Sequence, residues 1–233
     1  EGDIYKQEAG QSVRLTSYTA PFSRLVEQYA DLSGGNLNAR WSRKLRNGID
    51  VQVQTFYDRT NRYEASFGET RNTGDIDFVI HHPSWGRHNF SWGGGARSSR
   101  GMAIQVVSGF TFDPPARTDY LLTTFVQDEI TLVSDRLSLI LGSRFLRTNF
   151  ARFQAEPIVR LMWTPHKKHA IWTSYTRAVR TPSRVERDFQ TETLNGLDLG
   201  YRTLLIPNLF IDIASFYNRY NDCLLYTSDA ADE

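Results

Sequence analysis

The chain has 233 residues, and its 27 Lys and Arg against 26 Asp and Glu give a formal net charge of +1. A hydrophobic fraction of 40% excludes a disordered chain, and the near-zero charge argues against a protein that binds nucleic acid. No run reaches the roughly 18–20 apolar residues that a membrane-spanning helix needs, but a transmembrane β-strand of about 10 residues needs only one apolar face.

Segments in which apolar and polar residues alternate follow one another along the chain. The clearest are Leu37–Trp41, Ile49–Val53, Ile76–Ile80, Val159–Trp163 and Leu197–Tyr201. Alternation of this kind predicts antiparallel strands that have one apolar and one polar face. We therefore expect an all-β chain with about 11 strands in an antiparallel, up-and-down arrangement.

Two kinds of connection alternate between these segments. Short ones carry turn residues, and Asn47-Gly48 is the strongest hairpin signal, because both residues tolerate positive φ. Long ones are expected over 11–33, 64–72, 98–117 and 179–194, with one short exception near Ala151. Successive connections of a meander lie at opposite ends of the sheet, so one end has tight turns and the other has long loops. This asymmetry is typical of outer-membrane barrels.

Three features favour lipid rather than a soluble core around the apolar face. The segments 49–63, 120–133 and 209–220 exceed about 11 residues, whereas strands of soluble proteins have a mode of about 5–6. Aromatic residues gather near the strand ends, as they do at both interfaces of a bilayer. The polar face carries both signs of charge, which suits a water-filled or plugged lumen. A soluble all-β domain remains the alternative.

Several motifs together resemble the barrel of TonB-dependent outer-membrane receptors. They are Thr124–Leu132, Gly142–Arg144, Pro157–Pro165, Ala170–Arg184, Leu197–Arg202 and Asp212–Asn218. The most specific spacing is that of Trp172-x-Ser-Tyr-x-Arg-Ala-x-Arg-x-Pro-Ser183. The resemblance covers most of Gly34–Tyr220 and implies a barrel of about 22 strands around an N-terminal plug. Residues 1–222 would then form a partial transmembrane barrel.

The resemblance also implies a function. The protein would be a receptor in the outer membrane of a Gram-negative bacterium, surrounded by lipid, that imports a scarce nutrient such as a ferric siderophore. The ligand would be a small molecule or metal chelate, and nucleic acid is not expected as a partner. TonB and its inner-membrane complex would supply energy through a plug outside these residues. A passive porin-type channel and a soluble all-β carbohydrate-binding domain are the alternatives.

Charged residues mark the candidate ligand-facing positions. Pro182 cannot donate to a strand ladder, so the strand ends before it, and the nearby arginines are expected at the loop-side rim. Guanidinium groups there could bind anionic ligands or could pair with neighbouring carboxylates. These rim candidates are Arg177, Arg180 and Arg184.

The two faces of the later strands follow from the same alternation. One face, assigned to lipid, carries Leu197, Leu199 and Tyr201. The other face, assigned to the lumen, carries Arg160, Asp198 and Arg202. A one-residue slip would reverse every assignment, because side chains along a strand have a period of two.

No pattern points to an enzyme, a cofactor or a metal. His81 and His82 lie on opposite faces of a strand, so they do not easily share a metal ion. No nucleophile elbow or zinc-protease spacing occurs. The run 93–95 of three glycines lacks the strand-to-helix context of a phosphate loop. In a strand, these glycines are expected to allow bending or the close approach of another group.

The ends of the chain are atypical. The chain begins at Glu1 without a signal segment, and we expect an internal fragment of a longer protein. The segment Cys223–Glu233 loses the alternation, contains the only cysteine and resembles the conceptual translation of a sequencing adapter. We therefore expect residues 223–233 to be a non-native tail that adds nothing to the fold.

Overall fold

The structure is a computed structural model and describes residues 1–16, 19–65, 67–105, 112–149, 151–181, 191–206 and 209–222. Arg184 and the tail Cys223–Glu233 lie outside the described residues, so the expectations about them are not tested. Among the described residues, no helix is both long and apolar enough to cross a bilayer.

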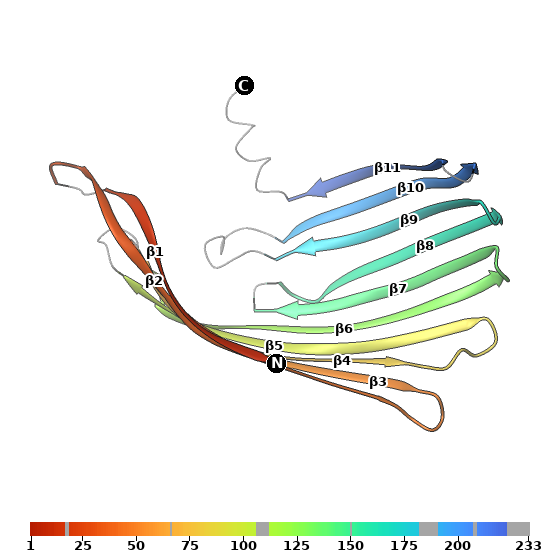
Figure 1. The fold of residues 1–233 in the computed structure, drawn as a ribbon, viewed down its shortest axis with the longest axis horizontal. Helices are drawn as coiled ribbons and strands as arrows, with labels where there is room; N and C mark the ends of the chain where they lie inside the picture. Colours follow the sequence, from red (N-terminus) through yellow and green to blue (C-terminus); the bar gives the residue numbers. More distant parts are fainter. Residues whose placement is uncertain are drawn as a thin grey trace. The chain divides into compact units, whose positions relative to one another are not determined.

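Eleven strands form one sheet in which each strand lies beside its neighbours in the sequence (Figure 1). The strands are β1 (Gly2–Thr16), β2 (Ser23–Lys44), β3 (Asp50–Tyr63), β4 (Phe67–His81), β5 (His88–Gln105), β6 (Ala116–Val133), β7 (Leu137–Thr148), β8 (Gln154–His166), β9 (His169–Arg180), β10 (Glu192–Ile206) and β11 (Leu209–Asn221). The sheet is not closed, because β1 and β11 are its two edges. The predicted all-β, antiparallel, up-and-down partial barrel is confirmed.

Tertiary contacts divide the chain into two units, which we describe separately. The first comprises Glu1–Trp41, Gln52–Phe78 and Gly95–Leu121, and so contains β1 and parts of β2 to β6. The second comprises Ser42–Val51, Val79–Gly94 and the chain from Leu122 onward, and so contains β7 to β11. The second unit contains the tight turns around 45–49, 82–87, 134–136 and 167–168, and the β3–β4 connection of the first unit is also short, with Glu64 N donating to Phe67 O (2.9 Å).

The buried core is small because a single sheet has no second layer to cover it. The buried hydrophobic residues of the described chain are Ala30, Ala65, Ala103, Leu146 and Ala151. Many large apolar side chains are exposed instead, among them Leu197, Leu199 and Tyr217. The apolar surface of this sheet therefore lies on a face and not in an interior.

The turn at Asn47-Gly48 forms the predicted hairpin but not with the predicted backbone. Leu45 N donates to Ile49 O (2.7 Å), and Gly48 N donates to Leu45 O (3.0 Å). Gly48 has a φ of 82°, whereas Asn47 is not among the described non-glycine residues with positive φ. The expectation that Asn47 also takes positive φ is wrong, because a three-residue loop needs only its last position in the left-handed region.

Three of the long connections expected from the sequence are partly strand, and one of them is 98–117, where β5 continues to Gln105 and β6 begins at Ala116. Residues 11–16 and 23–28 continue the β1–β2 ladder, in a register that runs from Gln11 opposite Gln28 to Thr16 opposite Ser23. β4 already begins at Phe67, within the expected loop 64–72. Backbone pairing sustains these strands although their side chains do not alternate between apolar and polar. Because the prediction of strands relied on that alternation, these segments were expected to be loops.

Candidate functional site

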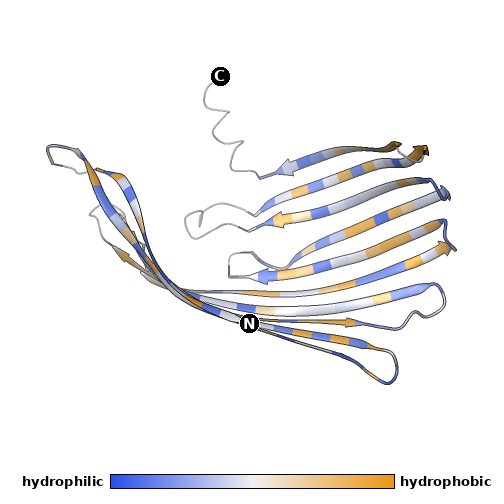
Figure 2. Cartoon of the chain, viewed as in Figure 1, coloured by the Kyte–Doolittle hydropathy of each residue, from blue (hydrophilic) through white to orange (hydrophobic). Residues whose placement is uncertain are grey.

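The five strands from β7 to β11 carry a continuous apolar row on one face. In this row each residue lies directly opposite the next across neighbouring strands, in the order Leu141, Val159, Tyr175, Leu197 and Tyr217. Their exposed fractions are 41%, 40%, 37%, 51% and 66%. Figure 2 shows hydrophobic and hydrophilic residues alternating along these strands. We call this surface the apolar face.

The adjacent row on the opposite face is polar at its centre. Arg160 lies opposite Ser174, and Ser174 lies opposite Asp198. The hydroxyl of Ser174, whose residue is only 5% exposed, donates to Asp198 Oδ2 (2.9 Å). The register therefore brings two of the candidates predicted from the sequence, Arg160 and Asp198, into one row on the face opposite Leu197. We call this surface the polar face.

Arg202, the third candidate for this face, belongs to an aromatic and ionic cluster. Its Nη2 and Nε donate to Asp212 Oδ2 at 2.7 and 3.1 Å. Its guanidinium carbon also lies 5.4 Å from the ring centroid of Trp172 and 5.7 Å from that of Phe210. Stacking of this kind orients a guanidinium group on the polar face while leaving its donors available.

A buried carboxylate organises the loop end of β7, β8 and β9. Glu156 has a side chain only 7% exposed and accepts from Arg144 Nε (2.5 Å). Its other oxygen accepts from Val179 N (2.9 Å). The β8–β9 ladder begins at Ile158 opposite Thr176, so Glu156 bonds to the β9 backbone beyond that ladder. One side chain thereby joins three strands at this end of the sheet.

The described rim arginines lie at the same loop end but on opposite faces of β9, since Arg177 shares the face of Tyr175 and Arg180 shares that of Ser174. Arg177 donates to the carbonyl oxygen of Ala155 and to Gln154 Oε1 (3.3 Å). Arg180 pairs with Glu192 at 3.1 Å across the β9–β10 ladder. Both arginines therefore make contacts within the sheet.

Sequence reasoning missed a second polar network, which lies in the first unit. Arg71 contacts Glu69 (2.5 Å) and Ser99 (3.4 Å), and the Ser99 hydroxyl lies 2.9 Å from that of Thr73. Arg97 Nε lies 2.7 Å from Asp75 Oδ2. In the sequence, every second residue from 69 to 77 is polar, which is the pattern of one face of a strand. Part of this segment was expected to be a loop, so the network was not predicted.

Glycines make room for this network. A β-carbon on Gly95 would overlap the carboxylate of Asp77, which fits the expectation that the run 93–95 allows close approach. A β-carbon on Gly101 would lie 3.0 Å from Glu69 Oε1. Among the described residues, no group of three or more His, Cys, Asp or Glu side chains could hold a metal ion. The polar face therefore offers a ligand charged side chains and backbone groups.

Comparisons with known proteins agree on one family. Residues 4–232 match the family described as TonB dependent receptor-like, beta-barrel. A comparison with curated proteins finds no match. The family and the structural neighbours are TonB-dependent receptors, which are transporters rather than enzymes.

Solved structures show the same fold at low sequence identity. The siderophore receptor PirA from Pseudomonas aeruginosa gives a TM-score of 0.70 at 13% identity over 85% of this chain and 41% of its own. The FrpB iron transporter from Neisseria meningitidis gives 0.69 at 12% identity over 84% and 37%. The ferripyoverdine receptor of P. aeruginosa, bound to ferripyoverdine, gives 0.61 at 14% identity over 83% and 33%. The match thus spans about two fifths or less of each of these three structures.

Proposed function

Because the chain belongs to the β-barrel family of TonB-dependent receptors, we propose that it forms part of the barrel wall of an outer-membrane receptor that imports a scarce nutrient. A ferric siderophore is the proposed nutrient class. The structural neighbours include a siderophore receptor and an iron transporter, which supports this choice of ligand. The proposed location is the outer membrane of a Gram-negative bacterium.

The observation that carries the proposal is the opposition of the two faces across β7 to β11. The row from Leu141 to Tyr217 would meet lipid, and the row through Arg160, Ser174 and Asp198 would meet the lumen. A barrel wall needs this arrangement, since hydrocarbon excludes charge whereas a lumen that holds water or a plug accepts it. The polar network around Arg71 in the first unit would likewise face the lumen.

The loop end would form the ligand-facing rim. Arg180, with Arg184 beyond the described residues, and Arg177, which would reach the ligand around the rim from the face of Tyr175, are the proposed contacts for an anionic chelate. Arginine suits this role because its planar fork of donors matches carboxylate and other oxyanion groups in pairs. Glu156, Gln154 and Glu192 would hold the rim in shape around the ligand.

Energy would reach the receptor from TonB and its inner-membrane complex. In this proposal TonB acts on a plug that the present residues do not include, and the barrel strands serve as a rigid wall. Movement of the plug, not of the wall, would release the ligand. A passive channel with the same wall would need no TonB, so dependence on TonB separates these two functions.

The test is uptake of radioactive iron by cells that express the complete receptor containing this chain. Iron-starved cells receive ⁵⁵Fe complexed with one catecholate or one hydroxamate siderophore, in strains with and without TonB. We expect uptake of at least one chelate, lost without TonB. Uptake that persists without TonB would identify a passive channel. A protein recovered from the soluble fraction would favour the soluble carbohydrate-binding alternative.

Rim residues are tested in the same assay. Arg177→Ala and Arg180→Ala should each weaken chelate binding by about tenfold, because each loses a charge-assisted hydrogen bond. Lys167→Ala is the matched control, since it removes an exposed basic side chain at the opposite, short-turn end. Equal effects of all three substitutions would contradict the rim assignment.

A further inference from the structure

A cavity of about 470 Å³ lies beside the β4–β5 turn, within the second unit. Aromatic rings, two imidazoles and one carboxylate line it. The lining residues are His82, Pro83, Trp85, His88, Phe90 and Asp128. The proposed function assigns no role to this cavity.

The register shows which face the cavity opens on. Thr131 N donates to Arg87 O (2.8 Å), which places Phe90 opposite Asp128. A β-carbon on Gly142 would lie 3.4 Å from Gln127 Cβ, so Gln127 shares the face of position 142. The next residue, Asp128, therefore points to the other face, which carries Leu141. The cavity thus opens on the apolar face, at its short-turn end.

One carboxylate oxygen of Asp128, at the cavity, has no hydrogen-bond donor among the described residues. Its Oδ2 lies 2.6 Å from His88 Nδ1. Its Oδ1 is shielded from solvent and makes no hydrogen bond to any residue that the structure describes. A carboxylate oxygen without a donor in such surroundings is costly. Rotation about the Cβ–Cγ bond, or movement of the Trp85 ring, which is 83% exposed, would present this oxygen to a ligand in the cavity.

The rings around the carboxylate favour a cation. The Trp85 and His88 ring centroids are 6.3 Å apart, and those of His82 and Phe90 are 5.7 Å apart. The His82 ring also accepts from Trp92 Nε1 (3.1 Å), which holds its position. Aromatic faces attract ammonium groups, and a neighbouring carboxylate adds a charge-assisted hydrogen bond. An anion would instead meet the charge of Asp128.

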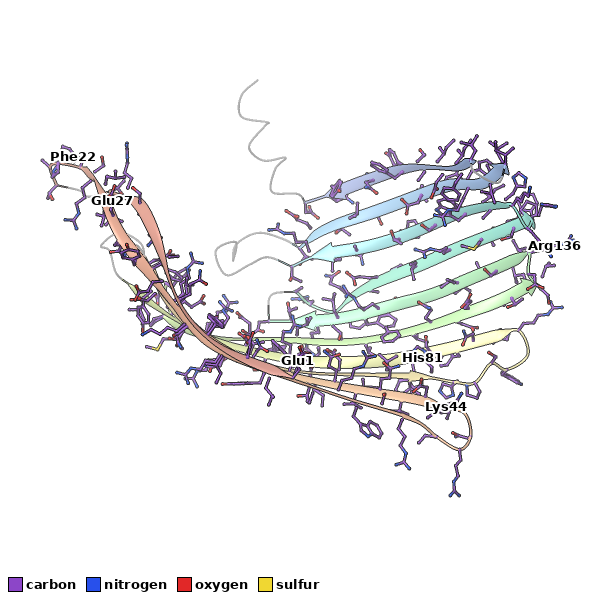
Figure 3. The ribbon with its side chains drawn as sticks, in the orientation of Figure 1. Glu1, Phe22, Glu27, Lys44, His81 and Arg136 are labelled. Atoms are coloured by element: carbon purple, nitrogen blue, oxygen red, sulfur yellow. The ribbon has the colours of Figure 1, made fainter. Side chains whose placement is uncertain are left out.

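Basic side chains lie at the short turns on this end of the sheet. Each described turn there has an exposed Lys or Arg in it or beside it: Lys44 and Arg46, Arg87, Arg136, and Lys167 and Lys168. Figure 3 labels Lys44 and Arg136 at two of these turns. The β2–β3 turn adjoins the cavity itself, since a β-carbon on Gly48 would lie 3.4 Å from Pro83 Cβ. A phosphate next to an ammonium group would find cations within reach.

We propose that this cavity binds the headgroup of an ethanolamine phospholipid. The primary ammonium donates to Asp128 between the rings of Trp85 and Phe90, the neighbouring basic turns attract the phosphate, and the acyl chains run along the apolar face. The inference rests on the part of the proposed function that places this face in lipid. A choline headgroup fits less well because its quaternary ammonium has no N–H to donate to Oδ1, and a glycerol headgroup has no cation.

The test is native mass spectrometry of the complete receptor in detergent with equal amounts of dimyristoyl phosphatidylethanolamine, phosphatidylcholine and phosphatidylglycerol. We expect the ethanolamine lipid to remain bound at least about fivefold more than either of the others. Asp128→Asn should abolish that preference. Asp135→Asn, which removes a charge from the neighbouring β6–β7 turn, should preserve it. Equal retention of the three lipids by the parent, or an unchanged preference in Asp128→Asn, would overturn the proposal.

Two further measurements keep the result interpretable. Trp85→Ala changes an exposed turn residue, so this variant should fold even if Asp128→Asn does not, and it should reduce retention of the ethanolamine lipid severalfold. Unchanged retention would count against the site. Uptake of ⁵⁵Fe chelate should be normal in both variants, because the cavity lies at the end opposite the rim. Loss of lipid preference with normal uptake supports the lipid site, whereas failure of uptake in the parent would refute only the transport function.

Discussion

The indole of Trp172 on β9 lies directly across Gly200 on β10, and a β-carbon at position 200 would overlap the ring. The same ring receives the guanidinium group of Arg202. An aromatic side chain that covers a strand glycine fills the space left by the missing side chain and helps to fix the strand register. This pair therefore joins the two strands and also orients a charged group on the polar face.

Gly200→Ala should destabilise the barrel, since the indole must move to admit the methyl group. Overpacking of this kind costs about 1–3 kcal/mol. The free energy of unfolding in urea, measured for the complete receptor in lipid vesicles, gives the value. Gly74→Ala is the control, because no atom lies within 4 Å of its added β-carbon. If both substitutions have the same effect, the contact with Trp172 contributes nothing to stability.

Leu199→Arg and Asp198→Asn test the assignment of the two faces. An arginine at position 199 would place a charge in hydrocarbon and should cost about 2–4 kcal/mol near the bilayer midplane. Asn at position 198 keeps an oxygen that can accept from Ser174, so folding should change little. Reversible folding into lipid vesicles measures both variants. The assignment is reversed if Asp198→Asn proves the more damaging.

Glu156→Ala should weaken the loop end far more than Glu192→Ala does. Glu156 is buried and binds both Arg144 and the backbone of Val179, so its loss leaves an unpaired N–H and costs about 1–3 kcal/mol. Glu192, whose side chain is 17% exposed, pairs with Arg180, whose side chain is 56% exposed, so its loss should cost roughly the 0–1 kcal/mol of a surface pair. Urea unfolding of the two variants in vesicles compares them, and equal losses would contradict the special position of Glu156.

The isolated chain should associate in aqueous buffer. Its edge strands β1 and β11 present unpaired backbone groups, and the row from Leu141 to Tyr217 is exposed. Light scattering after size-exclusion chromatography should show aggregates in buffer and smaller particles in detergent. A monomer that unfolds cooperatively in buffer without detergent would refute this expectation.

The sequence predicted the features that depend on alternation within one strand. The alternation of side chains along one strand predicts that Leu197 and Asp198 point to opposite faces of the sheet. In the register, Leu197 lies beside Tyr175 and Asp198 lies beside Ser174. The residues from Glu69 to Asp77 were partly missed because their outward partners are less apolar, so the pattern resembled a loop. The part of β1 after Gln11 was likewise expected to be a loop, because its apolar residues do not mark a clear face.

Features that depend on contacts between strands could not be predicted. The burial of Glu156 requires the ends of β8 and β9 to meet, and nothing within β8 alone indicates it. The cavity at Asp128 likewise combines a turn after β4 with a residue of β6, forty residues from its partner His88. Such contacts depend on the register between strands, and the pattern of residues within a single strand does not determine that register.

The most direct test of the central claim is quenching of a fluorophore by lipid-dissolved quencher at two adjacent residues. In a form of the complete receptor without other cysteines, cysteines introduced at positions 198 and 199 are labelled separately with bimane, and each protein is reconstituted in vesicles containing a nitroxide lipid. We expect the nitroxide lipid to quench the label strongly at Leu199→Cys and weakly at Asp198→Cys. A water-soluble quencher should instead quench the label at Asp198→Cys. Equal quenching by lipid at both positions, or the reverse order, would contradict a barrel wall with Leu199 in lipid and Asp198 in the lumen.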